Sequence, residues 1–194
     1  MRALLQIGIV MAAWTISTST GLGAWLSPCK TARLVASWKH DGLWLSSAID
    51  AFPISAGGNR VRFVGRLRAG GRSYDIYYDD HSEPDSEAHD ATKNLVVTSG
   101  RGKFLGLYNI SDIADIYGEP TGTDGSDVLF PAGKANGAPF GHRLHFGPKG
   151  PPKTIPRFYG YDLGFMTPAE VRKDLPRTKP WPEPGPRVAT YCRR

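Results

Sequence analysis

One segment, residues 79–90, gathers side chains that could bind a metal ion. It is rich in carboxylates, and His81, Asp85 and His89 follow one another at intervals of four. On a helix these three residues would share one face, and imidazole with carboxylate is a typical zinc ligand set. The carboxylates alone would suit calcium. Pro84 disrupts a helix, however, and no calcium-loop pattern is present, so a solvated connecting loop is the favoured interpretation.

Other catalytic arrangements find little support. His142 and His145 lie three apart in a predicted strand, so they should point to opposite faces and not share a metal. The sequence has no phosphate-binding loop, dinucleotide fingerprint, nucleophile elbow or His-Glu-x-x-His motif. We therefore favour a non-catalytic protein without a cofactor. The alternative is a metal-dependent hydrolase that uses residues 79–90 with zinc or calcium.

The elements that would position such residues begin with a hairpin over residues 59–80. Polar and apolar side chains alternate on both sides of Gly70-Gly71, which is a two-residue turn signal. This turn makes the numbers of facing residues add up to 141, and both faces of the hairpin agree with that register. The predicted pairs are Phe63 with Tyr78, Leu67 with Tyr74, Arg66 with Asp75, and Arg62 with Asp79.

Four arginines within nine residues of the first strand suggest an anion site. The predicted register offers a simpler interpretation, in which Arg62 and Arg66 pair with aspartates on a solvated face. Arg60 and Arg68 have no evident partner. These two residues are therefore the candidate binding residues of the hairpin.

Short elements are predicted along the rest of the body. Strands are expected at 95–98, 104–108, 127–130 and 143–146, and short helices at 111–117 and 167–175. The second hairpin has apolar residues on both faces, so we expect it to be covered on two sides. Ser111 and Thr167 are in position to cap the two helices, and Pro168 with Glu170 strengthens the second signal.

Residues 31–51 fit two structures. Their apolar side chains are spaced as on an amphipathic helix, but Asp41-Gly42 is typical of a hairpin turn. We favour strands, because Gly42 would weaken the centre of a helix. The sequence Gly42-Leu43-Trp44 also resembles the Gly-x-Trp motif that opens lipocalin-like barrels. That resemblance implies, as a further alternative, a small-ligand carrier with an apolar cavity inside a barrel.

The N-terminus has the layout of a secretory signal peptide. Arg2 precedes an apolar stretch from Ala3 to Trp14, and small residues continue to Gly23. The stretch is about a dozen residues long, shorter than the roughly twenty of a transmembrane helix. We predict a signal peptide at 1–23, export to the periplasm or the extracellular space, and no transmembrane segment after cleavage. The alternative is a buried N-terminal helix.

Two cysteines remain in the mature chain, Cys29 and Cys192, one near each end. An even number of cysteines in an exported protein predicts a disulfide. The alternative is a lipoprotein with a modified Cys29, which we disfavour because Pro28 occupies a position that needs a small residue.

The positive charge is concentrated at the C-terminus. The formal net charge is +6, yet residues 24–171 hold 16 basic and 16 acidic side chains. Residues 172–194 hold seven basic and two acidic side chains, and prolines recur among them. A basic, extended arm on a neutral domain favours contact with an anionic surface, a polysaccharide or an acidic protein over nucleic-acid binding. Its candidate binding residues are Arg177, Lys179, Trp181 and Arg187.

These observations together predict one domain with two terminal segments. Residues 1–23 form the signal peptide, 24–171 a single β-rich domain, and 172–194 a basic, Pro-rich C-terminal arm. We expect a mostly β fold, an antiparallel meander of hairpins that forms a small barrel or a sandwich with one or two short helices. The predicted function is that of an exported, non-catalytic binding or accessory protein.

Overall fold

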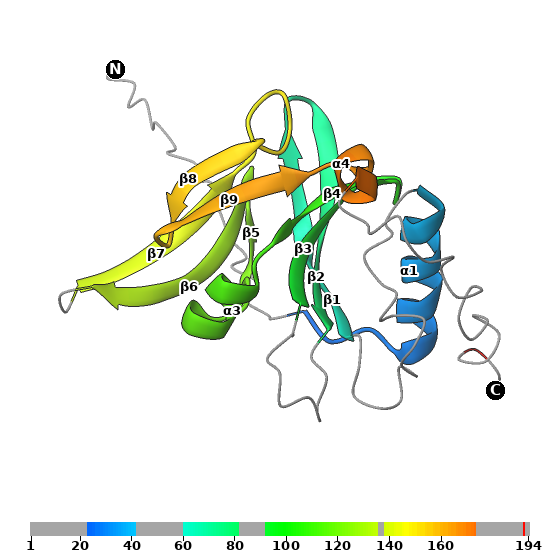
Figure 1. Ribbon diagram of the computed structural model, residues 1–194, viewed down its shortest axis with the longest axis horizontal. Helices are drawn as coiled ribbons and strands as arrows, with labels where there is room; N and C mark the ends of the chain where they lie inside the picture. The colour runs from blue at the N-terminus through cyan, green and yellow to red at the C-terminus, as the bar shows by residue number, and fades with distance from the viewer. Residues whose placement is uncertain (1–22, 42–59, 82–91, 136–137, 174–191, 193–194) are drawn as a thin grey trace, which may run out of the picture.

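The computed structural model describes residues 23–41, 60–81, 92–135, 138–173 and 192 (Figure 1). The elements, in chain order, are α1 (Pro28–Asp41), β1 (Arg60–Ala69), β2 (Arg72–His81), β3 (Thr92–Ser99), β4 (Phe104–Asn109), α3 (Ser111–Tyr117), β5 (Gly122–Asp124), β6 (Asp127–Ala135), β7 (Ala138–His145), β8 (Thr154–Phe158), β9 (Tyr161–Met166) and α4 (Pro168–Lys173). The predicted signal peptide, apart from Gly23, and most of the predicted arm lie outside these residues.

The strands form two antiparallel sheets. The larger has the order β1-β2-β3-β4-β9-β8, and the smaller has the order β5-β6-β7. Most neighbours in the sheets are also consecutive in the chain, as expected of a meander of hairpins. The sheets do not close into a barrel, and a sandwich-like arrangement fits them better. The prediction of a mostly β, antiparallel fold is confirmed.

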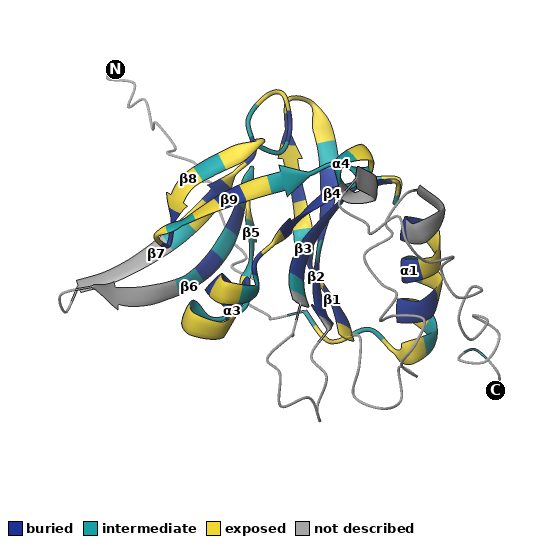
Figure 2. Cartoon of the chain, in the orientation of Figure 1, coloured by how far each residue is buried: buried dark blue, intermediate teal, exposed yellow. Residues whose placement is uncertain are grey.

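The apolar side chains of the larger sheet belong to two buried clusters, one on each face. Figure 2 shows buried stretches along strands of this sheet. One cluster joins β1–β4 to the smaller sheet through residues such as Ile76, Leu95 and Val128. The other joins the opposite face to α1, where Trp38 is fully buried against Val96 and its neighbours. The second hairpin, β3–β4, is therefore covered on two sides, as predicted.

The first hairpin follows the predicted register only near its turn. Arg66 faces Asp75 and Leu67 faces Tyr74, but a bulge between Phe63 and Gly65 shifts the rest by one residue. The remaining observed pairs include Phe63 with Tyr77, Arg62 with Tyr78, and Val61 with Asp79. The predicted pairs of Phe63 with Tyr78 and Arg62 with Asp79 are therefore wrong.

The bulge exchanges the environments of two side chains. An extra residue in one strand turns the following side chains to the other face. Arg62 becomes buried, and Phe63 is 37% exposed. The neighbouring strand β5 packs closely on the hairpin beside the bulge, since a Cβ atom on Gly65 would lie 2.3 Å from Thr123 Oγ1. Such a contact lies outside the hairpin and is invisible in the hairpin's own sequence.

The preference for strands in residues 31–51 is wrong in its first part. Residues 28–41 form α1, and Gly42 follows its last residue, so this glycine does not weaken the helix centre. Ser27 accepts a hydrogen bond from the Thr31 amide at its carbonyl oxygen (2.9 Å), and Pro28 is the first helical residue. A serine before an N1 proline is a helix-start signal. The Gly42-Leu43-Trp44 motif lies outside the described residues.

The two short helices lie where they were expected. Thr167 and Glu170 form a capping box before α4: the Thr167 amide donates to Glu170 Oε2 (2.8 Å), and the Glu170 amide donates to Thr167 Oγ1 (3.4 Å). In α3, Ser111 begins the helix without a capping hydrogen bond from its side chain. Its Oγ instead accepts from the Lys93 amide (2.9 Å), which ties the helix to β3. Strand β6 contains the strand predicted at 127–130, and β7 contains the one predicted at 143–146 except its last residue, Phe146.

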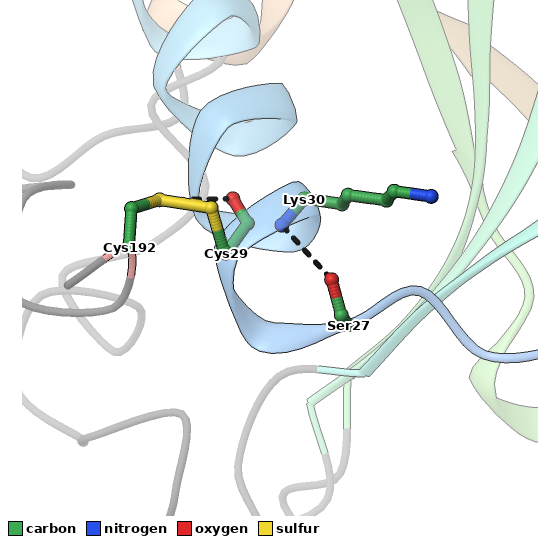
Figure 3. The surroundings of a disulfide bond; sticks show 4 residues. All are labelled: Ser27, Cys29, Lys30 and Cys192. Carbon is green, nitrogen blue, oxygen red and sulfur yellow. Dashed lines mark hydrogen bonds between the residues drawn. A yellow bond between two sulfur atoms is a disulfide. The ribbon is translucent and has the colours of Figure 1, made fainter. Parts of the chain in front are cut away.

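Cys29 and Cys192 form the predicted disulfide (Figure 3). Their Cα atoms lie 4.8 Å apart although the residues are separated by 163 positions in the chain. Cys29 stands in the first turn of α1, so the bond ties residue 192 to the layer that covers the larger sheet. Within the described residues, no helix is long and apolar enough to cross a membrane.

Candidate functional site

The predicted metal ligands are only partly within the described chain. His81 ends β2, and Asp85 and His89 lie outside the described residues. The residues that the structure describes contain no group of three or more His, Cys, Asp or Glu side chains that could hold a metal ion. The hydrolase that would use residues 79–90 stays an untested alternative.

The two arginines singled out as binding residues differ in their surroundings. The Arg60 guanidinium forms an ion pair with Asp80 (2.6 Å) and lies 4.5 Å from the ring centre of Trp25. The expectation that Arg60 lacks a partner is therefore wrong. Arg68 is exposed, and its backbone amide donates to the Gly125 carbonyl (3.2 Å). The arm residues Arg177, Lys179, Trp181 and Arg187 lie outside the described residues.

Arg62 is the most buried cation of the first hairpin. Its Nη2 donates to Glu119 Oε2 and to the Pro120 carbonyl, both at 2.9 Å. Its guanidinium carbon lies 5.6 Å and 5.5 Å from the ring centres of Trp25 and Tyr78. Burial and nearby carboxylates raise the pKa of Tyr78, so its hydroxyl stays neutral beside Arg62. Arg62 thus connects the sheet to the segment after α3 and is closed to an outside ligand.

A serine, a histidine and an aspartate meet near the start of β6, but not as a catalytic triad. His145 Nδ1 lies 2.7 Å from Asp127 Oδ1 and 3.3 Å from Ser126 Oγ. A triad needs the serine on one ring nitrogen and the carboxylate on the other. Here both contacts fall on the same nitrogen, so His145 cannot pass a proton from Ser126 while Asp127 orients it. His142 packs instead on Tyr159, with ring centres 3.7 Å apart.

A half-open cavity of about 630 Å³ lies at the turn end of the larger sheet. Three turns meet there: β1–β2, β3–β4 and the turn between β7 and β8. The Gly100 amide donates to the Ser73 carbonyl (2.8 Å), and a Cβ atom on Gly70 would lie 1.9 Å from the Pro148 carbonyl oxygen. These close backbone contacts hold the three turns against one another.

The cavity is lined by four cationic side chains, and the lining residues described include no carboxylate. The cations are Arg66, Arg72, Arg101 and Lys149. Arg66 donates to Asp75 Oδ2 (2.9 Å), and the hydrogen bond and charge of Asp75 raise the pKa of Arg66. Arg72, Arg101 and Lys149 are exposed and, within the part of the chain that the structure describes, form no ion pair. Among the described residues, three of the four lining cations therefore have no compensating carboxylate.

Each of the three free cations stands in or beside a tight turn. Gly70 and Gly71 both have positive φ, as a two-residue hairpin turn requires, and Arg72 follows them. Arg101 stands in the turn closed by the Gly102 amide on the Ser99 carbonyl (2.8 Å). Lys149 stands in the turn closed by the Gly150 amide on the Gly147 carbonyl (2.9 Å).

The lining of the cavity also includes apolar side chains. Leu105 of β4 and Phe165 of β9 are half-buried there, together with Pro151 and the largely buried Tyr74. The Phe165 ring is held by Tyr108, with ring centres 5.0 Å apart. The lining thus combines the exposed cations with an apolar wall formed by these side chains.

Sequence reasoning did not single out the cavity cations. Their common signal is the neighbouring glycine, in Gly71-Arg72, Gly100-Arg101-Gly102 and Lys149-Gly150. A cation on a tight turn is held at a defined place without losing exposure. The three turns meet only through tertiary packing, and no local sequence pattern predicts that they do. Comparison of the chain with models of protein families, with curated proteins and with solved structures finds no match.

Proposed function

We propose that this protein is an exported, non-catalytic binding protein that holds an anionic partner. The observation that carries the proposal is the cavity at the turn end of the larger sheet, with four cations and no carboxylate among its described lining residues. Guanidinium and ammonium groups recognise carboxylate, sulfate and phosphate through charge-assisted hydrogen bonds. The described lining residues offer no paired acid and base, and this supports binding over catalysis.

Export is supported by the disulfide. Disulfides persist in oxidising compartments and are rare where thiols are kept reduced. The bond between Cys29 and Cys192 therefore agrees with the signal peptide predicted at 1–23. Mass spectrometry of the protein from fractionated cells tests this directly. We expect a mature chain that begins near residue 24, outside the cytoplasm and with both thiols oxidised; an uncleaved, reduced chain would contradict export.

Charge reversal at the cavity tests anion binding. Dextran sulfate is a suitable probe, because its affinity reports charge without requiring a particular ligand. We expect the wild type to bind it more weakly as salt concentration rises, and Arg72→Glu/Arg101→Glu to lower the affinity at least about tenfold at low salt. The disulfide-bonded, full-length protein is used, and its unfolding midpoint is recorded to establish that each variant folds.

The matched control reverses the same number of charges elsewhere. Lys30 and Arg33 are exposed on α1, and Lys30→Glu/Arg33→Glu changes the net charge equally. We expect this control to lose less than about threefold in affinity, as a general charge effect would give. Equal losses in the two variants would show that the cavity is not the binding site and would overturn the proposal.

The basic arm is the second proposed contact with the anionic partner. Its contribution is measured in the full-length chain by Arg177→Gln/Lys179→Gln/Arg187→Gln, which keeps Cys192 and hence the disulfide. We expect a smaller salt dependence of dextran sulfate binding, because fewer counterions are displaced on association. An unchanged salt dependence would remove the arm from the binding surface.

A further inference from the structure

We infer that the cavity takes an amphiphilic anion, a molecule whose negatively charged head is joined directly to an apolar ring or chain. This inference rests on the proposed function and specifies the chemical class of its ligand. It depends on the arrangement of cations and apolar side chains around one hollow, and not on the total charge.

The cations define where the charged head binds. Arg72, Arg101 and Lys149 reach the cavity from three different turns, so their charges converge on it from separate backbone segments. Arg66 adds a fourth charge, which its pairing with Asp75 partly neutralises. A sulfonate, sulfate or phosphate head has enough oxygen atoms to accept hydrogen bonds from two or three of these donors at once.

The apolar wall gives no favourable contact to a small inorganic anion. Leu105, Pro151 and Phe165 present carbon surface, and an anion placed against it would lose water without gaining a hydrogen bond. A ring or short chain placed there gains from the burial of its own apolar surface. A cavity of about 630 Å³ also has the size of sites that hold organic ligands, much larger than one sulfate ion.

The turns keep the two parts of the cavity in place before a ligand arrives. Ser99 Oγ accepts from the Lys103 amide (3.1 Å), which stiffens the turn that carries Arg101. A Cβ atom on Gly150 would lie 2.8 Å from the Tyr74 hydroxyl, so the segment that carries Lys149 packs directly on β2. Preorganised groups bind more tightly because less conformational entropy is lost on binding.

The concave shape distinguishes this ligand from a membrane surface. A bilayer is approached by protruding side chains, and a hollow with its apolar residues inside cannot place them among lipid chains. A single molecule can enter the hollow with its ring on the apolar wall and its head on the cations. We therefore assign the site to a single amphiphilic molecule.

Two dyes with related rings and different charge provide the test. The probe 8-anilinonaphthalene-1-sulfonate carries a sulfonate, whereas N-phenyl-1-naphthylamine has the same rings without it. We expect the native, disulfide-bonded protein to bind one molecule of the sulfonate dye, and the neutral dye at least about tenfold more weakly. Sodium sulfate at equal concentration should displace little of the bound sulfonate dye.

Substitutions of two kinds distinguish the contribution of the ligand's charged head from that of its contact with the apolar wall. Arg101→Gln/Lys149→Gln should reduce the affinity of the sulfonate dye to about that of the neutral dye, and Lys30→Gln/Arg33→Gln should not. Leu105→Thr should weaken both dyes and leave dextran sulfate binding unchanged. Pro151→Ser replaces Leu105→Thr if the latter does not fold.

The outcomes distinguish this inference from the function beneath it. If the two dyes bind with equal affinity, the inference of an amphiphilic ligand is wrong. It is also wrong if sulfate displaces the bound sulfonate dye as effectively as additional sulfonate dye does. Neither result bears on the proposed function. If Arg72→Glu/Arg101→Glu also leaves dextran sulfate binding intact, the proposed function fails as well. If Arg72→Glu/Arg101→Glu abolishes dextran sulfate binding but the wild type does not bind the sulfonate dye, only the inferred ligand class is wrong.

Discussion

Arg62 and Arg66 stand four residues apart on β1, yet their side chains lie in different environments. The Arg62 side chain is 3% exposed and pairs with Glu119, whereas the Arg66 side chain is 55% exposed and pairs with Asp75. The bulge between them changes the face on which side chains emerge. A buried cation with few partners depends strongly on each of them, because it has left water.

Removing the carboxylate opposite the buried arginine tests this dependence. Glu119→Gln leaves Arg62 with the Pro120 carbonyl and a neutral amide, and we expect a loss of about 1–2 kcal/mol in the free energy of unfolding. The control is Asp124→Asn, whose partner Arg143 is exposed, with an expected loss under about 0.5 kcal/mol. Urea unfolding of both variants measures the difference. Equal losses would mean that the burial of Arg62 contributes nothing.

The stability of the fold should depend on pH through His142. Burial lowers the pKa of His142 below its usual 6.5, because the charged imidazole is poorly solvated beside Tyr159. Between the lowered pKa and 6.5, the unfolded chain binds more protons than the folded one. Stability is therefore lost as pH falls below 6.5, and the loss is complete at the lowered pKa.

This pH dependence is measured by urea unfolding between pH 8 and pH 5. We expect His142→Phe to lose less stability over this interval than the wild type, because its ring cannot take a proton. A wild-type pH profile in His142→Phe would contradict the assignment.

At the scale of elements, the hairpins were predictable and their irregularities were not. Gly70-Gly71 and the alternation of polarity around it predicted β1 and β2 and the register next to the turn. The bulge between Phe63 and Gly65 lies where β5 packs on Gly65. The start of α1 has a signal in Ser27-Pro28. Gly42 follows the last residue of the helix, where a glycine does not weaken it, and its position relative to the helix end is not visible in the sequence.

The two turn glycines should differ in their tolerance of alanine. Both have positive φ, which costs a non-glycine residue about 1 kcal/mol. A Cβ atom on Gly71 meets nothing within 4 Å, whereas one on Gly70 would lie 1.9 Å from the Pro148 carbonyl oxygen. We expect Gly70→Ala to lower the thermal unfolding midpoint clearly more than Gly71→Ala. It should also weaken binding of the sulfonate dye, because it displaces the turn that carries Lys149.

Comparable effects of the two alanines on the midpoint would contradict the close contact between the β1–β2 turn and Pro148. Gly71→Asn serves as a further control, since asparagine tolerates positive φ better than alanine does. It should unfold close to the wild-type midpoint.

At the scale of the whole molecule, two sheets and α1 form a layered body that one covalent bond closes. The Cys29–Cys192 bond spans 163 of the chain's 194 positions, so it restricts most of the chain when the protein unfolds. In the chain-entropy description, a loop of this length corresponds to about 5 kcal/mol of stabilisation, as an upper value. The bond also keeps residue 192 beside the first turn of α1.

Removal of the disulfide should therefore lower stability without changing the fold of the sheets. We expect Cys29→Ser/Cys192→Ser to shift the urea midpoint strongly downward, with a far-ultraviolet circular dichroism spectrum like that of the wild type. Wild-type protein reduced with a phosphine should reproduce the shift. An unchanged midpoint in both cases would show that the bond does not stabilise the folded chain.

The sequence by itself determined what depends on neighbours in the chain. Hairpin turns, strand alternation and the capping box at Thr167 follow from local backbone preferences, and the pairing of Cys29 with Cys192 follows from there being no other cysteine to bond. Tertiary structure decided what depends on contacts across the fold: the bulge beside β5, the burial of Arg62, and the meeting of three turns around one cavity. These contacts join residues far apart in the chain, and their packing has no local pattern in the sequence.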